Sequence, residues 1–340
     1  MPDPPAPAAQ ATSGQGREVT VGAQDGAAVA PPDGFAIGHW TAPEAQTGCT
    51  VILPPPGARA GVEVRGGGPG TRETDIIGAL ANPEEATAIL FTGGSAHGLA
   101  AADGVMRWCE EHGRGYRTPG GLVPLVPAAV IYDLTAGVDT LRPGPDHGYA
   151  ACEAAAEGMP ERGSVGAARG SAVAKARGRE HASPGGIGYA AVRTAAGETI
   201  SALVVVNATG DVLDEAGGVL AGPRGEDGEM LRTVELMRTG ESPPKRAGVV
   251  EAERQGTTLV CVMTDAPLDK VSCAKVARMA GAGIARAVDP VFTPFDGDIV
   301  FCLSSGDPAP SQWLVMRIGS LAATVVAAAI RDGVRQAASG

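Results

Sequence analysis

The sequence predicts a layered α/β domain, in which helices and strands pack as separate layers around an aliphatic core. Short apolar runs rich in β-branched residues alternate with Ala-rich stretches of helical periodicity along the 340-residue chain. Hydrophobic residues make up 44% of the chain but aromatic residues only 4%, so Ala, Val, Leu and Ile must supply most of the core. The 50 Gly and 27 Pro residues follow neither a three-residue period nor a heptad, which excludes collagen and coiled-coil architectures.

Six apolar, β-branched runs are predicted as strands, at residues 50–53, 88–92, 129–134, 201–207, 257–264 and 298–304. Four helices are predicted at residues 95–112, 148–156, 268–288 and 312–337. Ser95 is placed to cap the first helix, and Asp265 or Asp269 the third. The third helix has the clearest apolar stripe, formed by Cys273, Ala277, Ala280, Ile284 and Val288.

The net charge of −11 argues against nucleic acid or anionic membranes as partners. The six Cys residues form no CxxC pair and the five His residues are scattered, so we expect no metal, no cofactor and a reducing, cytoplasmic location. Residues 1–33 form a Pro/Ala-rich tail, expected to be disordered, without the basic and apolar regions of a signal peptide. The apolar run at residues 320–330 is too short to span a bilayer. We therefore expect one domain, residues 34–340.

Residues 214–255 differ from the rest of the chain because they are charged and rich in Gly and Pro, with one short helix expected near residues 230–237. This surface excursion ends abruptly at Gly256, and a strand begins at Thr257. A Thr at a strand start is ordinarily only a β-former. The alternative is chemical: if the bond before Thr257 is cut, the new α-amine can act as general base for the Thr257 hydroxyl. Gly256 has no side chain to obstruct attack on its carbonyl.

Three other motifs have competing interpretations. Asp296-Gly297-Asp298 is first a hairpin signal, but its two carboxylates could orient a nucleophile and its ammonium; a calcium loop fits less well. The run GGSAHG at residues 93–98 departs from the serine-hydrolase elbow because His97 replaces its last Gly, and a Ser-capped turn explains it better. The run GGGPG at residues 66–70 lacks the Gly-Lys-Ser/Thr of a nucleotide-binding loop.

Taken in order, the longer motifs resemble one family, the L-aminopeptidase/D-amidase-esterase (DmpA) family, which includes β-peptidyl aminopeptidases and aminohexanoate (nylon) oligomer hydrolases. The resemblance covers residues 34–332 and rests on these runs: GCTVILPPPGARAGVEVRGGGPGTRETDII, TGGSAHGLAAADGVMRWCEEHGRG, VPAAVIYDL, GSVGAARGSAVAKARG, GGIGYAAV, VVVNATGDV, TTLVCVMTDAPLDK and TPFDGDIVFCLSS. It implies a four-layer αββα sandwich resembling the N-terminal-nucleophile hydrolases, and self-cleavage into residues 1–256 and 257–340.

The resemblance also implies roles for individual residues. Thr257 would be the nucleophile for both self-cleavage and substrate, Asn207 would donate to the oxyanion, and Lys175 would lower the pKa of the nucleophile. Tyr132 would line the pocket and touch the substrate. Asp296 and Asp298 match the acidic pair of the nylon-hydrolase branch, whereas the aminopeptidase branch has Ser and Glu there. Each residue also has a structural alternative: a turn cap for Asn207, a surface position for Lys175 and a core position for Tyr132.

The family resemblance implies an autoprocessing hydrolase of short peptides, amino-acid amides or aminohexanoate-like oligomers that acts as a homotetramer. Two alternatives stay open: an acyltransferase of the ornithine acetyltransferase type, which shares the fold and the Thr nucleophile, and an uncleaved binding or scaffold relative. Three positions depart from the family pattern. Gly256 stands where many members have Asn, Arg169 lies in a stretch usually made of small residues, and His97 occupies a position that is commonly aromatic.

Overall fold

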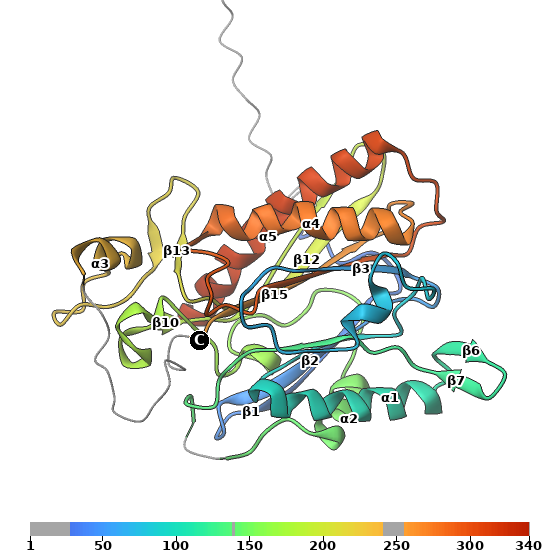
Figure 1. Cartoon of the computed structure of the whole chain (residues 1–340), viewed down its shortest axis with the longest axis horizontal. Coiled ribbons are helices and arrows are strands. Elements are labelled where there is room, and N and C mark those ends of the chain that lie inside the picture. The colour runs from blue at the N-terminus through green and yellow to red at the C-terminus, as the bar shows by residue number, and fades with distance from the viewer. Residues whose placement is uncertain (1–27, 138–139, 241–254, 340) are drawn as a thin grey trace, which may run out of the picture.

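The computed structural model describes residues 28–137, 140–240 and 255–339, which form two central β-sheets between two layers of helices (Figure 1). The first sheet has the strand order β1-β2-β5-β8-β4, and only its β5–β8 pair is parallel. Its strands are β1 (Ala36–Ala42), β2 (Thr47–Leu53), β4 (Thr71–Arg72), β5 (Ile89–Thr92) and β8 (Ala128–Val130).

The second sheet has the order β11-β12-β15-β17-β3, and its one parallel pair is β15–β17. Its strands are β3 (Arg59–Val64), β11 (Ile187–Arg193), β12 (Thr199–Asn207), β15 (Thr257–Thr264) and β17 (Ile299–Ser304). Both sheets carry a face against a helix layer and a face against the other sheet, so their central strands are buried on both sides. All residues of β2, β12 and β15 are buried for this reason.

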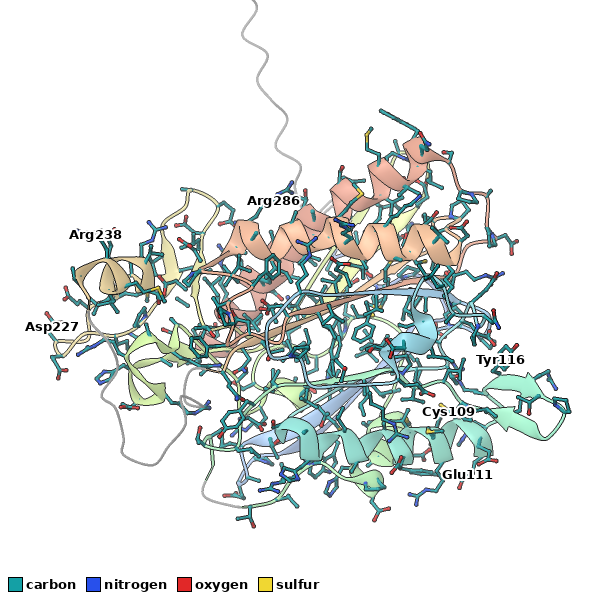
Figure 2. All side chains as sticks on the ribbon, viewed as in Figure 1. Cys109, Glu111, Tyr116, Asp227, Arg238 and Arg286 are labelled. Carbon is teal, nitrogen blue, oxygen red and sulfur yellow. The ribbon has the colours of Figure 1, made fainter. Side chains whose placement is uncertain are left out.

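Two long helices, α4 (Lys270–Ala287) and α5 (Gln312–Ser339), pack on the second sheet, while α1 (Ala101–Glu111) and α2 (Pro145–Glu153) cover the first (Figure 1). The expected four-layer αββα sandwich is therefore confirmed. Charged side chains face outward from both helix layers: Figure 2 shows Arg286 on the outer side of α4 and Glu111 on that of α1.

Strand alternation divides the apolar side chains of the second sheet between two cores. On β15, Val260 and Val262 face the α4–α5 layer, whereas Leu259, Cys261 and Met263 face the first sheet. Glycines let the layers approach: a Cβ on Gly188 of β11 would overlap the backbone carbonyl of Ala329 in α5. The aliphatic composition thus fits a sandwich in which helix backbone lies almost directly on strand backbone.

The remaining elements are short. Three small sheets pair β6 (Tyr116–Thr118) with β7 (Gly121–Val123), β9 (Ala172–Val173) with β10 (Ser183–Pro184), and β13 (Asp211–Leu213) with both β14 (Val219–Ala221) and β16 (Val288–Asp289). The short helices are α3 (Thr233–Thr239) and the 3-10 turns η1 (Thr74–Ile77), η2 (Ser95–Ala100), η3 (Gly166–Ala168), η4 (Lys175–Arg177) and η5 (Arg179–His181). The β6–β7 hairpin and α3 lie at opposite ends of the molecule, as the labels Tyr116 and Arg238 show in Figure 2.

All six predicted strands are present, with β15 at its predicted bounds and the others shifted by a few residues. The four predicted helices are also present, but residues 95–100 of the first form the 3-10 turn η2, so that α1 begins only at Ala101. Of the two residues predicted to cap α4, Asp265 and Asp269, it is Asp269 that does so, by accepting a hydrogen bond from Ser272 N. Ser95 as a cap is wrong, because it has a positive φ of 52° inside η2 and its side chain makes no capping bond. Among the strands of six residues or more, β1, β3 and β11 are not predicted, since their runs are interrupted by Gly, charged or aromatic residues. The strands of two or three residues other than β8 are not predicted either.

Two further expectations need correction. The prediction of a hairpin at residues 296–298 is wrong, because these residues belong to a loop between β16 and β17. Asp296 pairs with Gly256 through an isolated bridge. The last apolar run belongs to a 28-residue helix, α5, which is long and apolar enough to cross a membrane by length and composition. Yet 61% of that apolar window is buried within the protein, where α5 packs on β11 and β12.

The predicted N-terminal tail and processing segment lie partly outside the described residues, namely at positions 1–27 and 241–254. Within the described part of the tail, Val29 packs against the core between the sheets and its carbonyl accepts a hydrogen bond from the Tyr189 hydroxyl. Within the described part of the excursion, α3 is the short helix expected near residues 230–237.

Candidate active site

The candidate nucleophile lies at the first position of the central strand β15, opposite the last position of β12. The antiparallel register pairs Thr257 directly with Asn207, so the two predicted residues meet at the same edge of the second sheet. Both are almost completely buried, at 5% and 0% exposure. The Asn207 Oδ1 accepts a hydrogen bond from Ala172 N at 3.0 Å, which fixes the orientation of the amide. Its Nδ2 has no hydrogen-bond partner among the described residues, so this edge holds an unused buried donor.

A buried lysine joins this strand end to the segment that precedes the nucleophile. Lys175 Nζ donates to Asn207 O at 2.8 Å, to Asn207 Oδ1 at 2.9 Å and to Gln255 O at 2.9 Å. Three acceptors use all three hydrogens of an ammonium group. Ala174 brings the lysine to this position through a left-handed backbone conformation, with a φ of 62°. Lys175 therefore has the predicted place beside the site and not the alternative surface position.

The two predicted carboxylates approach the junction from the loop before β17. Asp298 Oδ1 accepts from Thr258 N at 2.6 Å, one residue after the nucleophile. Asp296 Oδ1 accepts from Thr209 N at 3.1 Å, and Asp296 Oδ2 from the Thr293 backbone and hydroxyl. Each carboxylate is 2% exposed. Asp298 thus binds the backbone just after the Gly256–Thr257 bond, whereas Asp296 binds the backbone of Thr209, two residues after Asn207.

The Gly256–Thr257 bond is itself enclosed by hydrogen bonds. Gly256 N donates to Phe295 O at 3.1 Å, and the carbonyl of Gly256 accepts from Gly297 N at 3.0 Å. The Thr257 hydroxyl also donates to this carbonyl. The hydroxyl therefore lies against the carbonyl of the preceding residue, and a backbone N–H already points at the carbonyl oxygen.

Burial changes the acid–base properties of two of these groups in opposite directions. Burial lowers the pKa of Lys175 to about 7, with a further lowering by Arg179, while Asp296 and Asp298 act to raise it. Burial raises the pKa of Asp298 to about 7, reinforced by the neighbouring Asp296 carboxylate and opposed by the Thr258 backbone hydrogen bond. A buried cation and a buried acid that both titrate near neutral pH are typical of catalytic sites.

The predicted site residue Tyr132, and the two departures from the family pattern at His97 and Arg169, are not joined to the nucleophile by hydrogen bonds in the part of the chain that the structure describes. Tyr132 is half-buried in the irregular segment just after β8 and does not contribute to the core clusters. His97 is exposed in η2, and Arg169 is half-buried after η3 with its Nε buried and unpartnered among the described residues. The substrate contact expected of Tyr132 remains a prediction.

Sequence reasoning missed three groups that the fold brings to the site. Asp133 is buried, accepts hydrogen bonds from Gly94 N at 2.6 Å and Thr47 Oγ1 at 2.7 Å, and acts on Lys175 through its charge. Thr209 N binds Asp296, and Gly297 N binds the Gly256 carbonyl. Each missed group lies within two positions of a predicted site residue, so proximity in sequence was the available signal.

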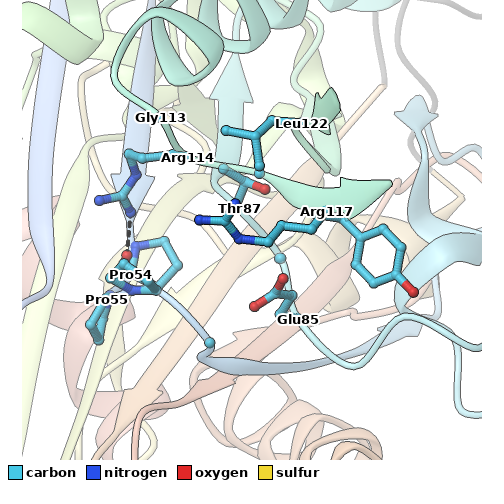
Figure 3. Close-up of a pocket in the computed structure, with 13 residues that line it drawn as sticks. Pro54, Pro55, Glu85, Thr87, Gly113, Arg114, Arg117 and Leu122 are labelled. Atoms are coloured by element: carbon cyan, nitrogen blue, oxygen red, sulfur yellow. Dashed lines mark hydrogen bonds between the residues drawn. The ribbon is translucent and has the colours of Figure 1, made fainter. Parts of the chain in front are cut away.

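A separate pocket of about 410 Å³ lies between the Pro54–Pro56 turn, the end of α1 and the β6–β7 hairpin (Figure 3). Arg114 donates to the Pro54 carbonyl at its wall, and Arg117 and Glu85 also line it (Figure 3). None of the predicted site residues lines this pocket. Within residues 28–137, 140–240 and 255–339, no group of three or more His, Cys, Asp or Glu side chains is placed to hold a metal ion.

Comparison with known proteins gives consistent matches over almost the whole chain. The family described as peptidase family S58 matches residues 31–339. An uncharacterized aminopeptidase of Mycobacterium tuberculosis (strain ATCC 25618 / H37Rv) is 39% identical over 326 residues, which cover 89% of this chain and 92% of the relative. A 6-aminohexanoate-oligomer endohydrolase of Kocuria sp. (strain KY2) is 30% identical, over 81% of this chain and 74% of the relative.

Two solved structures share the fold. The L-aminopeptidase D-Ala-esterase/amidase of Ochrobactrum anthropi, described as a variant of the Ntn hydrolase fold, superposes with a TM-score of 0.64 at 20% identity, covering 90% of this chain and 86% of that one. A β-aminopeptidase of Burkholderia sp. superposes with a TM-score of 0.63 at 23% identity, covering 88% and 84%. The four-layer sandwich is thus an Ntn-hydrolase-type fold.

Proposed function

The chain belongs to peptidase family S58, and from this premise we propose that it is an autoprocessing hydrolase of amide bonds whose nucleophile is Thr257. The observation that carries the proposal is the contact between the Thr257 hydroxyl and the Gly256 carbonyl, whose oxygen also accepts a hydrogen bond from Gly297 N–H. A nucleophile in contact with a polarised carbonyl is the arrangement that acyl transfer needs.

In the maturation step, the Thr257 oxygen adds to the Gly256 carbonyl carbon and the scissile C–N bond breaks. The hydroxyl proton passes to the departing Thr257 nitrogen, which becomes the free α-amine. The product is an ester between Gly256 and the Thr257 oxygen, and one water molecule hydrolyses it to the Gly256 carboxylate and the free hydroxyl. Gly297 N–H would stabilise the negative charge that develops on the Gly256 oxygen during this step.

In the catalytic cycle, the same oxygen attacks the carbonyl carbon of an amide substrate. The Thr257 α-amine takes the hydroxyl proton and delivers it to the leaving amine as the amide C–N bond breaks. Water then hydrolyses the acyl-enzyme ester. We assign two donors to the substrate oxyanion: Gly297 N–H, which binds the Gly256 carbonyl oxygen in the precursor, and the unpartnered Asn207 Nδ2. Removal of one such donor typically costs about 10²–10³ in kcat.

Lys175 and the acidic pair position these groups. Lys175 holds both oxygen acceptors of Asn207, and its charge favours an uncharged α-amine at Thr257, which is the basic form. Asp298 holds the backbone of Thr258 and so fixes the strand end that carries the nucleophile. Tyr132 is proposed as a substrate contact on the family resemblance alone.

The proposal is tested by hydrolysis of glycyl, β-alanyl and 6-aminohexanoyl p-nitroanilides. We expect wild type and Thr257→Ser to hydrolyse at least one of them, and the isosteric Thr257→Val, which lacks the hydroxyl, to hydrolyse none. Hydrolysis by Thr257→Val at the wild-type rate would contradict the assignment of the nucleophile. Formation of a new amide in preference to free acid, when a second amine is added, would assign the acyltransferase instead.

The cellular setting is also part of the proposal. The six cysteines are all buried and unpaired, as expected for a protein of a reducing compartment such as the cytoplasm. We propose a homotetramer on the family resemblance, and light scattering of the purified protein measures the assembly.

A further inference from the structure

Self-cleavage and substrate turnover pass through the same kind of ester. The surroundings of Gly256 in the uncleaved chain therefore indicate which substrate acyl groups fit the site. In both reactions an acyl group becomes bonded to the Thr257 oxygen. During maturation that acyl group is residue 256 with the chain before it, and during turnover it is the acyl half of the substrate. Because the oxygen is fixed by the pairing of β15 with β12, the place of Gly256 is also the place of the substrate's acyl group. This inference rests on the proposed function and deepens it.

The space beside the α-carbon of Gly256 is closed on the side where an L-residue carries its side chain. A Cβ built there would overlap Asp296 Oδ1, the backbone N of Thr209 and the hydroxyl of Thr209, all well inside the 3.0 Å that real Cβ atoms keep. Thr209 N and Asp296 Oδ1 are hydrogen-bonded to each other at 3.1 Å, and both residues are buried. One of the three atoms is a backbone nitrogen, and the hydrogen bond between Thr209 N and Asp296 Oδ1 holds the two residues together. A change of side-chain rotamer alone therefore cannot make room for a Cβ atom.

We propose that Thr209 and Asp296 form a specificity wall that excludes acyl groups with an L side chain on the α-carbon. The enzyme then takes acyl donors whose α-carbon is a CH₂ group: glycyl, β-alanyl and longer ω-aminoacyl amides. Such groups keep the carbonyl in place, and the glycyl nitrogen can donate to Phe295 O as Gly256 N does. The wall explains in physical terms why Gly is the residue before the nucleophile in this chain.

The first test compares p-nitroanilides of glycine, 6-aminohexanoate and L-alanine with the mature wild-type enzyme. One methylene group that a pocket cannot accommodate changes kcat/KM by about 10–200-fold. We expect kcat/KM for L-alanine p-nitroanilide to be at least ~100-fold below that of the better of the other two, at the upper end of that range because the wall includes backbone. Hydrolysis of the L-alanine compound with equal or higher kcat/KM would overturn the proposal while leaving the nucleophile assignment intact.

The second test places the same methyl group in the chain itself and needs no substrate. We expect self-cleavage of Gly256→Ala to be at least ~100-fold slower than wild type, measured as the fraction of intact chain by mass spectrometry over time. Gln255→Ala is the matched control, because the Gln255 side chain is exposed and only its backbone carbonyl contacts Lys175.

Circular dichroism and thermal melting establish that Gly256→Ala is folded, and a folded variant that cleaves at the wild-type rate would refute the wall. A wild-type chain that stays whole contradicts the proposed function instead, so the two failures are distinguishable.

Discussion

Replacement of Asp298 by Asn should change the pH dependence of stability by an amount that follows from the burial of this carboxyl group. Asp298 is 2% exposed, and burial beside Asp296 raises its pKa from 3.8 to about 7. Between these two values the native chain holds one more proton at this position than the unfolded chain. The free energy of unfolding therefore falls as pH rises through this window, and the stability present below pH 3.8 is lost once pH exceeds about 7.

The magnitude follows from the size of the pKa shift. At about 1.36 kcal/mol per unit, raising the pKa from 3.8 to about 7 removes about 4 kcal/mol of stability between the acid and neutral limits. Asn cannot ionise, so the stability of Asp298→Asn does not fall at this position as pH rises from the acid to the neutral limit. Its amide can still accept from Thr258 N but places an NH₂ group against Phe292 N–H, which costs stability equally at all pH values.

The assay is urea unfolding followed by tryptophan fluorescence, with every protein carrying Thr257→Val so that self-cleavage does not interfere. The stability of Asp298→Asn relative to its parent should increase by about 4 kcal/mol from about pH 4 to about pH 8. The matched control is Asp307→Asn, at an exposed residue. Its stability relative to the same parent should change by much less than about 4 kcal/mol over this pH range. A pH-independent difference for Asp298→Asn would refute the conclusion that this carboxyl is buried at a cost.

Three other substitutions test separate parts of the structure. Lys175→Met removes the three hydrogen bonds of a buried ammonium group, each worth about 1.5–3 kcal/mol, and these bonds hold Asn207 and the Gln255 carbonyl beside the scissile bond. The folded variant should therefore remain one chain, and cleavage at the wild-type rate would contradict the positioning role of Lys175. Asn207→Ala removes the proposed oxyanion donor and should lower kcat by about 10²–10³ with a smaller change in KM, and an unchanged kcat would exclude that role. Asp269→Ala removes the α4 cap and should cost about 1 kcal/mol in urea unfolding without slowing self-cleavage, whereas a loss of cleavage would show that the cap and the site are coupled.

The layers of the fold were predictable because its elements have strong local signals. Residues 257–264 form a continuous run without Gly, Pro or charged residues, in which five of the eight residues are β-branched, and β15 has these bounds. In contrast, β3 (RAGVEV) was missed because its charged residues and Gly61 obscure a strand whose pairing with β17 supplies the burial. Ser95 failed as a cap because the turn before α1 requires a positive φ at this residue, a feature of tertiary packing and not of local propensity.

The residue types of the site were predictable from the motifs, but their contacts were not. Nothing in the sequence indicates that Asn207 and Thr257 stand opposite each other, since this depends on the register of two strands 50 positions apart. Gly297 lies between two predicted site residues, but its role as a donor could not be predicted, because a backbone amide acquires that role only when the loop before β17 folds against Gly256. The structure therefore supplies two kinds of information that the motifs lack: the register between distant strands and the positions of backbone hydrogen-bond donors.

The central claim is that Thr257 attacks the carbonyl of Gly256 and becomes a new N-terminus. Intact-mass measurement and N-terminal sequencing of the purified full-length chain test it most directly. We expect two chains, residues 1–256 and 257–340, with the second beginning Thr-Thr-Leu-Val, and a single chain for Thr257→Val. A wild-type protein that remains one chain yet hydrolyses an amide, or a cut at any other bond, would contradict it.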